Sequence, residues 1–375
     1  MEFEEYRSQF PVADKFTYLN HAAISAPSLK VLRVLESVTN SFVYQGITSY
    51  PDWMRRIEEV RGLFAGLINA RPDEVAFAGN TSEGLSHVAQ GILWKEGDVV
   101  LLPVPEFPAN VYPWLNLKRK GVGVSYILRR EGRFTVEDVE RALSPRVRLI
   151  SVSYVDFIGG FRCDLEAIGD LCRRKGILFC VDAIQGLGAI PLDVKRCGIH
   201  FLAAGGHKWL LSVMGIGGLF VSREVMDIVR PACVGWKSVV EDDNFFDIRF
   251  DLKPNAAGFE PGTMNVAGIY GLGAAIELLN KVEIKRINER ICALNDLFFE
   301  GLKKRGFKVV TSMEKEERSG ILSFAPPSDP GAIYRFLTER DIMVSLRGNL
   351  IRISPHFYNN RTDVGAFFDA LDDFS

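Results

Sequence analysis

Short apolar runs alternate with amphipathic stretches over much of this 375-residue chain. Between about Glu74 and Ser222, seven runs have the length and composition of buried strands. Several of them are separated by stretches with helical periodicity, and the stretch 164–175 ends at Gly176, a typical helix stop. The pattern therefore predicts an α/β fold with a mostly parallel, seven-stranded sheet. The seven runs are residues 75–78, 98–102, 124–128, 149–155, 177–182, 201–204 and 218–222.

After about Gly268 the pattern changes. A long helical stretch reaches Arg305, and short strands, a helix near 331–340, a strand pair around Arg347-Gly348-Asn349 and a final helix from Thr362 follow it. This half predicts a smaller α+β domain. No internal repeat or long linker interrupts the chain. We expect an N-terminal segment (1–20) packed on the small domain, a large domain (21–265) and a small C-terminal domain (266–375).

Composition and charge limit the classes of partner that this chain is expected to bind. With 45 Lys+Arg against 47 Asp+Glu, the net charge of −2 favours neither nucleic acid nor an anionic membrane over a small ligand. The N-terminus, M-E-F-E-E-Y-R, is acidic where a signal peptide is basic, and no apolar stretch reaches spanning length without a charge or a Gly/Pro break. The six cysteines contain no C-x-x-C pair, which predicts reduced thiols. We expect a cytoplasmic protein with no nucleic-acid or membrane partner.

The histidines give no metal site. His87 follows a predicted helix start and His200 lies in a predicted strand, and neither has a second His, Cys or Asp placed to complete a ligand set. Both are interpreted as core or surface residues. No metal is expected.

The run I-L-F-C-V-D ends in Asp182, and Gln185 follows in a glycine-rich turn. Ligands of open α/β sheets bind beyond the carboxyl ends of the strands, so Asp182 is placed to meet a ligand cation. The alternative is that Asp182 caps the next helix.

A second segment, V-A-F-A-G-N-T-S-E-G, leads from a strand through Asn80, Thr81 and Ser82 into a helix. Free N–H groups, hydroxyls and the positive end of the helix dipole suit a phosphate there. The alternative is an ordinary capped helix, with Asn80 and Glu83 as the cap. The chain lacks both G-x-x-x-x-G-K-[ST] and a G-x-G-x-x-G after a strand, which argues against ATP and NAD.

Lys208, in G-G-H-K-W, ends an apolar run although lysine tolerates burial poorly. It follows Asp182 by 26 positions, behind the next predicted strand, so parallel topology brings both to one sheet edge. A lysine condensed with an aldehyde carries no buried ammonium. Pyridoxal phosphate supplies an aldehyde, a ring nitrogen for the aspartate and a phosphate for the helix start. The alternative is a structural lysine paired with Asp182 or Glu260.

Together these segments resemble the class V aminotransferase family of fold-type I pyridoxal-phosphate enzymes. That family contains cysteine desulfurases, selenocysteine lyases and isopenicillin N epimerase-like proteins. The resemblance implies the fold of that enzyme group, an amino acid or amine substrate, and active sites shared across a homodimer interface. The motifs that carry it, in chain order, are Y-L-N-H-A-A, G-N-T-S-E-G, E-F-P-A-N-V-Y-P-W, V-D-A-I-Q-G-L-G-A, G-G-H-K-W, F-E-P-G-T-M-N and I-R-I-S-P-H-F-Y-N-N.

The resemblance also implies roles for single residues. Lys208 forms the internal aldimine and moves protons at the substrate Cα, and Asp182 pairs with the pyridine nitrogen. Gln185 bonds to the phenolic oxygen of the ring, and Arg352 clamps the substrate carboxylate. Without the resemblance, Arg352 would be interpreted as a surface residue on an edge strand. The implied phosphate donors are Thr81, Ser82, His207 and, for the neighbouring subunit's phosphate, Thr263.

Two departures from the family pattern reduce the number of reactions that this chain is expected to catalyse. Phe107 stands where desulfurases place a histidine over the cofactor; it resembles the epimerase-like branch and cannot transfer a proton. No cysteine lies between Cys292 and the C-terminus, and the turn before Arg352 is short. Both features argue against desulfuration through a persulfide.

Three further residues have open roles. Asp156 is aligned less securely with the cofactor-binding positions and receives no assignment. His21 and His356 fall in segments that the family folds around the substrate pocket, which makes them candidates for contact with substrate or cofactor.

The sequence thus predicts a pyridoxal-phosphate-dependent enzyme that deprotonates an amino acid at Cα, as an aminotransferase or a Cα/Cβ lyase. The alternatives are an isopenicillin N epimerase-like epimerase and a non-catalytic scaffold that retains the fold.

Overall fold

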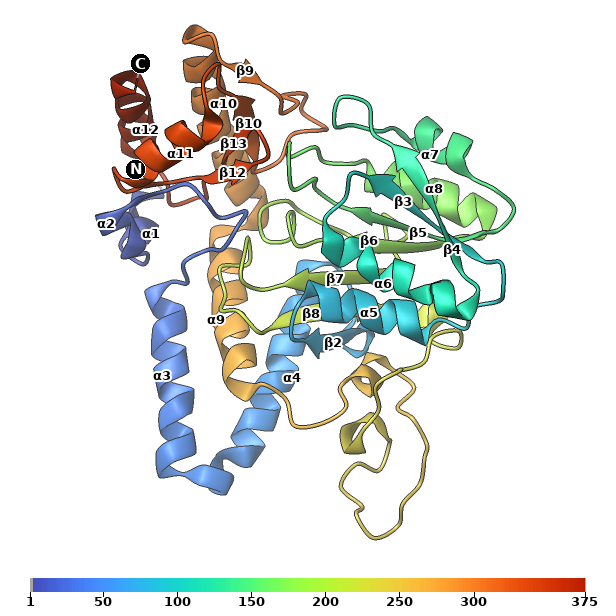
Figure 1. Cartoon of the computed structure of the whole chain (residues 1–375). Helices are drawn as coiled ribbons and strands as arrows, with labels where there is room; N and C mark the ends of the chain where they lie inside the picture. The colour runs from blue at the N-terminus through green and yellow to red at the C-terminus, as the bar shows by residue number, and fades with distance from the viewer. Residues whose placement is uncertain (1–2, 375) are drawn as a thin grey trace.

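The computed structural model describes residues 3–374, and its centre is a seven-stranded sheet (Figure 1). The strand order is β2-β8-β7-β6-β5-β3-β4, and only β8 runs antiparallel to its neighbours. The predicted mostly parallel α/β sheet is confirmed, because each of the seven apolar runs forms one strand. The strands are β2 (Val75–Ala78), β3 (Val99–Val104), β4 (Gly123–Leu128), β5 (Val147–Ser153), β6 (Leu178–Asp182), β7 (Phe201–Gly205) and β8 (Gly217–Val221).

Helices cover both faces of this sheet (Figure 1). Alternate residues of one strand serve opposite faces: Leu101 of β3 joins one apolar cluster and Leu102 joins the other. The first cluster includes residues of α4, α8 and α9, and the second includes residues of α5 and α6. The helices are α3 (Leu29–Tyr44), α4 (Tyr50–Leu67), α5 (Thr81–Gly91), α6 (Tyr112–Leu115), α7 (Val136–Ala142), α8 (Leu165–Lys175) and α9 (Val266–Val282).

Local signals set the helix ends. The Asp164 side chain accepts a hydrogen bond from the Ala167 N–H at the start of α8. The helix stops at Gly176, whose φ of 65° is left-handed and suits a residue without a Cβ. The predicted end of this helix at Gly176 is therefore confirmed.

The C-terminal part carries a four-stranded sheet of order β12-β13-β10-β9. The long helical stretch predicted up to Arg305 is two helices, because the chain turns at Glu283, whose φ is 71°. The predicted strand pair is the hairpin β12–β13, closed by Gly348 at φ 58°. The elements are α10 (Ile284–Lys304), β9 (Lys308–Val309), β10 (Leu322–Ala325), α11 (Pro330–Thr338), β11 (Ile342–Met343), β12 (Ser345–Arg347), β13 (Leu350–Ile353) and α12 (Arg361–Asp373).

The start of the described chain lies against this C-terminal part (Figure 1). The helices α1 (Glu4–Arg7) and α2 (Val12–Lys15) lead into β1 (Thr17–Tyr18), which pairs in parallel with β11. Leu19 belongs to the apolar cluster formed by α10, α12 and the small sheet. Within residues 3–374, no helix is both long and apolar enough to cross a membrane.

Candidate active site

Segments from distant parts of the chain meet at a cavity of about 470 Å³ beyond the carboxyl ends of the central strands. β6 ends in Asp182, Lys208 follows β7, and α5 begins at the same edge. Because β6 and β7 are parallel neighbours, these residues lie at one sheet edge. The lining residues are Ala22, Ala23, Ile24, Asn80, Thr81, Ser82, Phe107, Ala109, Phe157, Asp182, Ile184, Gln185, His207, Lys208, Arg347 and Arg352.

Lys208 is buried, with 9% of its surface exposed, and its amine forms no hydrogen bond or ion pair with the described residues. Burial lowers the pKa of this amine to about 8, although the nearby Asp182 charge opposes the shift. The structural alternative with Glu260 is excluded, because Glu260 pairs with Arg61 at 2.6 Å. The Lys208 Nζ lies over the Phe107 ring, 5.6 Å from the ring centroid. Lys208 is therefore a buried amine that loses its proton at a lower pH than an exposed lysine.

Asp182 is almost completely buried at the end of β6. Its Oδ1 accepts one hydrogen bond, from the Ile184 N–H at 3.0 Å. Burial raises the pKa of the carboxyl to about 6, and the backbone N–H of Ile184 and the Lys208 charge only partly oppose this shift. A carboxylate at such a position is stabilised by any cation that enters the cavity.

The start of α5 has hydroxyl and amide groups next to the same cavity. The Thr81 Oγ1 accepts a hydrogen bond from the Gly205 N–H at 2.9 Å, which ties the helix start to the end of β7. Ser82 and His207 line the cavity beside it. Asn80 also caps the helix, since its Oδ1 accepts from the Glu83 N–H at 3.0 Å. The capped-helix interpretation is thus correct for Asn80, while Thr81, Ser82 and His207 border open space.

Gln185 is held in place by contacts at both ends of its amide. Its Nε2 donates to the Ala22 carbonyl at 2.9 Å, and its Oε1 accepts from the Trp209 Nε1 at 3.0 Å. Trp209 is fully buried. An amide nitrogen has two N–H groups, so Gln185 retains one donor while its orientation is fixed.

Arg352 lies on β13, an inner strand between β12 and β10, and is only 1% exposed. It is therefore neither a surface residue nor on an edge strand. One guanidinium nitrogen donates to the Phe157 carbonyl at 2.7 Å, another lies 3.4 Å from the Ser345 Oγ, and Nε has no partner in the described chain. Burial, followed by the nearby Arg347, lowers the pKa of Arg352 to about 9. A buried guanidinium that faces a cavity without a carboxylate partner suits an anionic ligand.

Several lining residues were not predicted. Residues 22–24 come from the stretch between β1 and α3, Phe157 from the loop after β5, and Arg347 from the end of β12. Only Arg347 had a usable signal. In a hairpin whose turn is Gly348-Asn349, Arg347 and Arg352 must project from the same face.

Asp156 does not line the cavity. Its carboxylate lies 3.3 Å from Arg129 and accepts hydrogen bonds from the N–H groups of residues 158 and 159. Arg129 also lies 3.5 Å from Glu106, and burial raises the pKa of Glu106 to about 7. Asp156 thus shapes the turn that presents the Phe157 carbonyl to Arg352.

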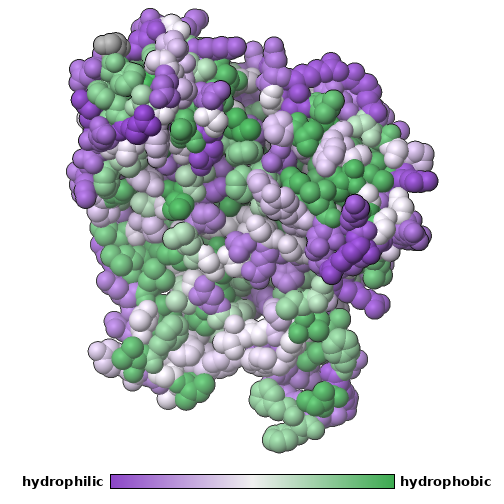
Figure 2. Space-filling model, in the orientation of Figure 1, coloured by the Kyte–Doolittle hydropathy of each residue, from purple (hydrophilic) through white to green (hydrophobic). Residues whose placement is uncertain are grey.

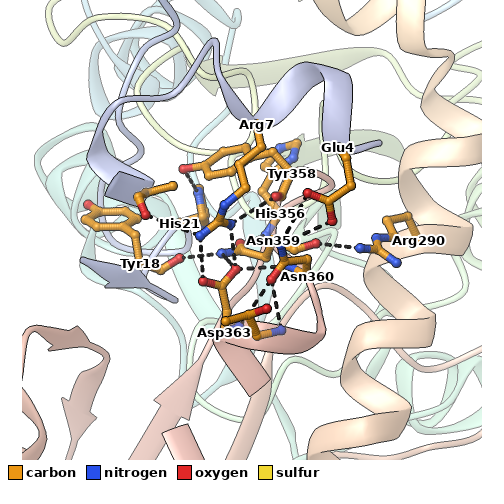
Figure 3. Close-up of polar contacts among 12 residues, drawn as sticks. Glu4, Arg7, Tyr18, His21, Arg290, His356, Tyr358, Asn359, Asn360 and Asp363 are labelled. Carbon is orange, nitrogen blue, oxygen red and sulfur yellow. Dashed lines mark hydrogen bonds and ion pairs between the residues drawn. The ribbon is translucent and has the colours of Figure 1, made fainter. Parts of the chain in front are cut away.

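His21 and His356 lie outside the cavity lining, in a polar network that joins the N-terminal segment to the C-terminal part (Figure 3). The His21 Nδ1 lies 2.8 Å from the Ser354 carbonyl, so it donates, and Nε2 accepts from the Tyr358 hydroxyl at 2.8 Å. His356 is bonded to the Trp209 carbonyl and the Phe357 N–H. The candidate role of both histidines in ligand contact is therefore not supported by their position.

Thr263 is exposed and lies outside this cavity. Its role toward a neighbouring subunit's phosphate stays a prediction.

The cavity fits pyridoxal phosphate by the chemistry of its donors. It offers a buried amine without a partner, a buried carboxylate with one hydrogen bond, and a helix start with hydroxyls. These groups match an aldehyde, a ring nitrogen and a phosphate in turn. The described residues contain no cluster of three or more His, Cys, Asp or Glu side chains that could hold a metal.

Comparison with known proteins agrees with this geometry. Residues 17–367 match the family model described as aminotransferase class-V. A probable cysteine desulfurase of Methanothermobacter thermautotrophicus is 29% identical, over 100% of this chain and 98% of the relative. An uncharacterized aminotransferase of Bacillus subtilis, YcbU, is also 29% identical, over 98% and 97% of the two chains.

Solved structures share the fold. A cysteine desulfurase from Thermococcus onnurineus NA1 superposes with a TM-score of 0.90 at 24% identity, over 99% of this chain and 97% of the other. A cystine C–S lyase in complex with cysteine persulfide gives a TM-score of 0.91 at 22% identity, over 97% and 99%. Two of these proteins are named cysteine desulfurases, whereas the residues of this chain predict that it does not act through a persulfide. Among the described residues, however, no cysteine lines the cavity.

Proposed function

This chain belongs to the class V aminotransferase family and is a pyridoxal-phosphate-dependent transferase or lyase; from this premise we propose that it deprotonates an α-amino acid at Cα. One observation carries the proposal: Lys208 and Arg352 are buried cations without a carboxylate partner, and both line one cavity. Such an arrangement destabilises the empty cavity and favours an anionic ligand with a reactive neighbour.

Different cavity residues would hold different groups of the cofactor. Lys208 would hold the aldehyde carbon, Asp182 the ring nitrogen and Gln185 the ring hydroxyl. Thr81, Ser82 and His207 would hold the phosphate. When bound, pyridoxal phosphate withdraws electrons from the amino acid attached to it and so makes the Cα proton acidic.

The chain's own residues bind the substrate and move its proton. Arg352 binds the α-carboxylate through parallel N–H groups, which fixes the orientation of Cα. The Lys208 amine, released when the substrate's own amine takes its place, accepts the Cα proton. Burial lowers its pKa to about 8, so a larger fraction is neutral near physiological pH than in an exposed lysine. Phe107 offers an aromatic face and no proton.

Both transamination and loss of a Cβ substituent fit these roles. A persulfide on the enzyme does not, because no thiol among the described residues lines the cavity. Epimerisation is less well supported, since none of the relatives named above is described as an epimerase.

The test is spectroscopic and chemical. Purified protein reconstituted with pyridoxal phosphate should show a visible absorbance band that shifts when L-amino acids are added. Borohydride should fix the cofactor's mass on the Lys208 peptide. Assays for oxo acid with and without an oxo-acid acceptor, for ammonia and for sulfide then separate transferase from lyase. A colourless protein that cannot be reconstituted would instead indicate the scaffold alternative.

We also propose a homodimer. A loop that bridges Val239 to Leu252 extends from the molecule and exposes large apolar side chains, with Phe246 fully exposed and Ile248 86% exposed. Figure 2 shows the hydrophobic surface at this tip. Exposed apolar patches of this kind favour association. Thr263 is exposed and lies outside its own cavity, so the role predicted for it requires a partner subunit. Light scattering should give twice the chain mass, and Phe246→Asp should weaken the dimer.

We propose a cytoplasmic location. None of the six cysteines forms a disulfide in the described structure, and four of them are buried thiols. Unpaired thiols are typical of a reducing compartment. Cell fractionation should recover the protein with the cytosol.

A further inference from the structure

The hairpin β12–β13 places two arginines on the same cavity wall. Ser345 pairs directly with Arg352 across the two strands, and Arg347 is two residues from Ser345 on β12. Side chains two apart on a strand share a face, as do directly paired residues. Both guanidinium groups therefore project from one face of the hairpin, and both line the cavity.

Charges in this cavity are unbalanced. Lys208, Arg347 and Arg352 line it, whereas Asp182 is the only carboxylate among its described lining residues. Arg347 donates only to the carbonyl of its neighbour Leu346, at 3.0 Å, and has no ion-pair partner in the described chain. Arg347 and Arg352 are diagonal neighbours across the two strands, and their like charges repel unless an anion lies near them.

No nearby carboxylate supplies that anion. Asp156 interacts with Arg352 through space, but it is held by Arg129 at 3.3 Å and faces a different cavity. Glu106 is likewise taken by Arg129 and the Ser153 hydroxyl. A ligand in the cavity would supply that anion.

The proposed function accounts for only part of this excess. Asp182 holds the cofactor's ring nitrogen, Lys208 holds its aldehyde carbon, and Arg352 holds the substrate's α-carboxylate. The cofactor's phosphate is held at the start of α5 by Thr81, Ser82 and His207. Arg347 remains as a half-buried cation without an assigned anion.

We propose that Arg347 binds a second carboxylate, carried on the side chain of the substrate, so that the enzyme prefers dicarboxylic amino acids. This inference rests on the proposed function and names its substrate class. The reason is geometric: a ligand held at its α-carboxylate by Arg352 has its side chain in the same cavity as Arg347. A charge-assisted contact there stabilises a dicarboxylate over its neutral amide.

Matched substrates and variants test this. Steady-state kinetics would compare L-glutamate with L-glutamine and L-aspartate with L-asparagine, so that only the side-chain charge changes. In the reconstituted wild type, kcat/KM should be greater for the acid of at least one pair. Arg347→Gln should reduce that preference roughly 10- to 100-fold, with kcat/KM for the amide little changed. Arg347→Lys should restore part of it. The control, Arg130→Gln, removes a 75% exposed charge and should change neither value.

A binding measurement supplies a second readout. Succinate and butyrate have the same number of carbons but different numbers of carboxylates. Calorimetry on the reconstituted enzyme should show tighter binding of succinate, and Arg347→Gln should remove most of the difference.

The outcomes are separable. An equal loss on acids and amides in Arg347→Gln would mean that both arginines share the α-carboxylate, and would overturn the proposal. A lower cofactor affinity with an unchanged substrate ratio would assign Arg347 to the cofactor and would overturn it too. If no L-amino acid shifts the spectrum of the wild type, the proposed function itself fails, independently of Arg347.

Discussion

Two buried polar clusters of this molecule differ in how their groups are satisfied. In the network of Figure 3, Asp363 accepts from both terminal nitrogens of Arg7, at 2.8 and 2.9 Å, and from Asn359 at 2.9 Å. The His21 ring has a partner at each nitrogen. In the cavity, by contrast, the Lys208 amine and the Arg352 Nε have no partner among the described residues.

The difference separates structural groups from ligand-binding groups. Both clusters are buried, and both contain residues that the sequence marks as conspicuous. Groups such as Asp363 and His21, which have partners inside the network, stabilise the fold, because they regain the hydrogen bonds that they lost with water. An unsatisfied charge destabilises the fold and persists where a ligand completes it. Residues of the two clusters should therefore respond oppositely to substitution.

The largest effect is expected at Lys208. Lys208→Ala should reduce turnover by roughly 10³- to 10⁴-fold, because the Cα proton loses its acceptor. The free energy of unfolding should not fall, since a buried amine without a partner is removed. Single-turnover kinetics and urea denaturation measure the two quantities. A variant that loses stability but keeps its turnover would reverse the comparison.

Asp363 should show the opposite behaviour. Asp363→Ala leaves Arg7 without its ion-pair partner, and we expect a loss of about 4 kcal/mol in unfolding free energy. The turnover of the folded fraction should change little. The control is Asp372→Ala, which breaks an exposed ion pair with Arg305 and should cost far less. Equal losses in the two variants would mean that burial of the network is unimportant.

His21 adds a pH dependence to the same network. Burial lowers the pKa of its imidazole to about 4, whereas in the unfolded chain it has the ordinary value of 6.5. Between these values the unfolded chain binds more protons, so acid favours unfolding. The contribution is intact above pH 6.5, and about 3 kcal/mol is lost as the pH falls through 4.

Urea denaturation as a function of pH checks this dependence. The slope of unfolding free energy against pH should be smaller in His21→Gln than in the wild type between pH 4 and 6.5. His200→Gln, at a less buried site, should change the slope less. An unchanged slope in His21→Gln would contradict the assignment.

The smallest effect is expected when lysine replaces Arg352, because the positive charge remains and only the planar guanidinium group is lost. Arg352→Lys should raise KM for L-amino acids about 20-fold, because a bidentate contact becomes a single one. KM for simple amines, which lack the carboxylate, should hardly move. A parallel increase for both substrate types would remove Arg352 from carboxylate binding.

Much of the fold could be predicted from the sequence. The seven strand runs are apolar because both faces of the sheet are covered, and that pattern is local. The ends of α8 are marked by Asp164 and Gly176 for equally local reasons. The division between α9 and α10 was not predicted, because Glu283 adopts a left-handed conformation that is uncommon for glutamate.

The candidate site, too, could be predicted only in part. By itself, the sequence determined that Asp182, Lys208 and the start of α5 lie at one sheet edge, because strand ends and parallel topology fix those positions. Only the tertiary structure decided which polar groups found partners: it satisfied His21 and His356 and left Arg347 and Arg352 facing open space. The reason is that a strand end is a property of neighbouring residues, whereas a hydrogen-bond partner comes from segments hundreds of residues away.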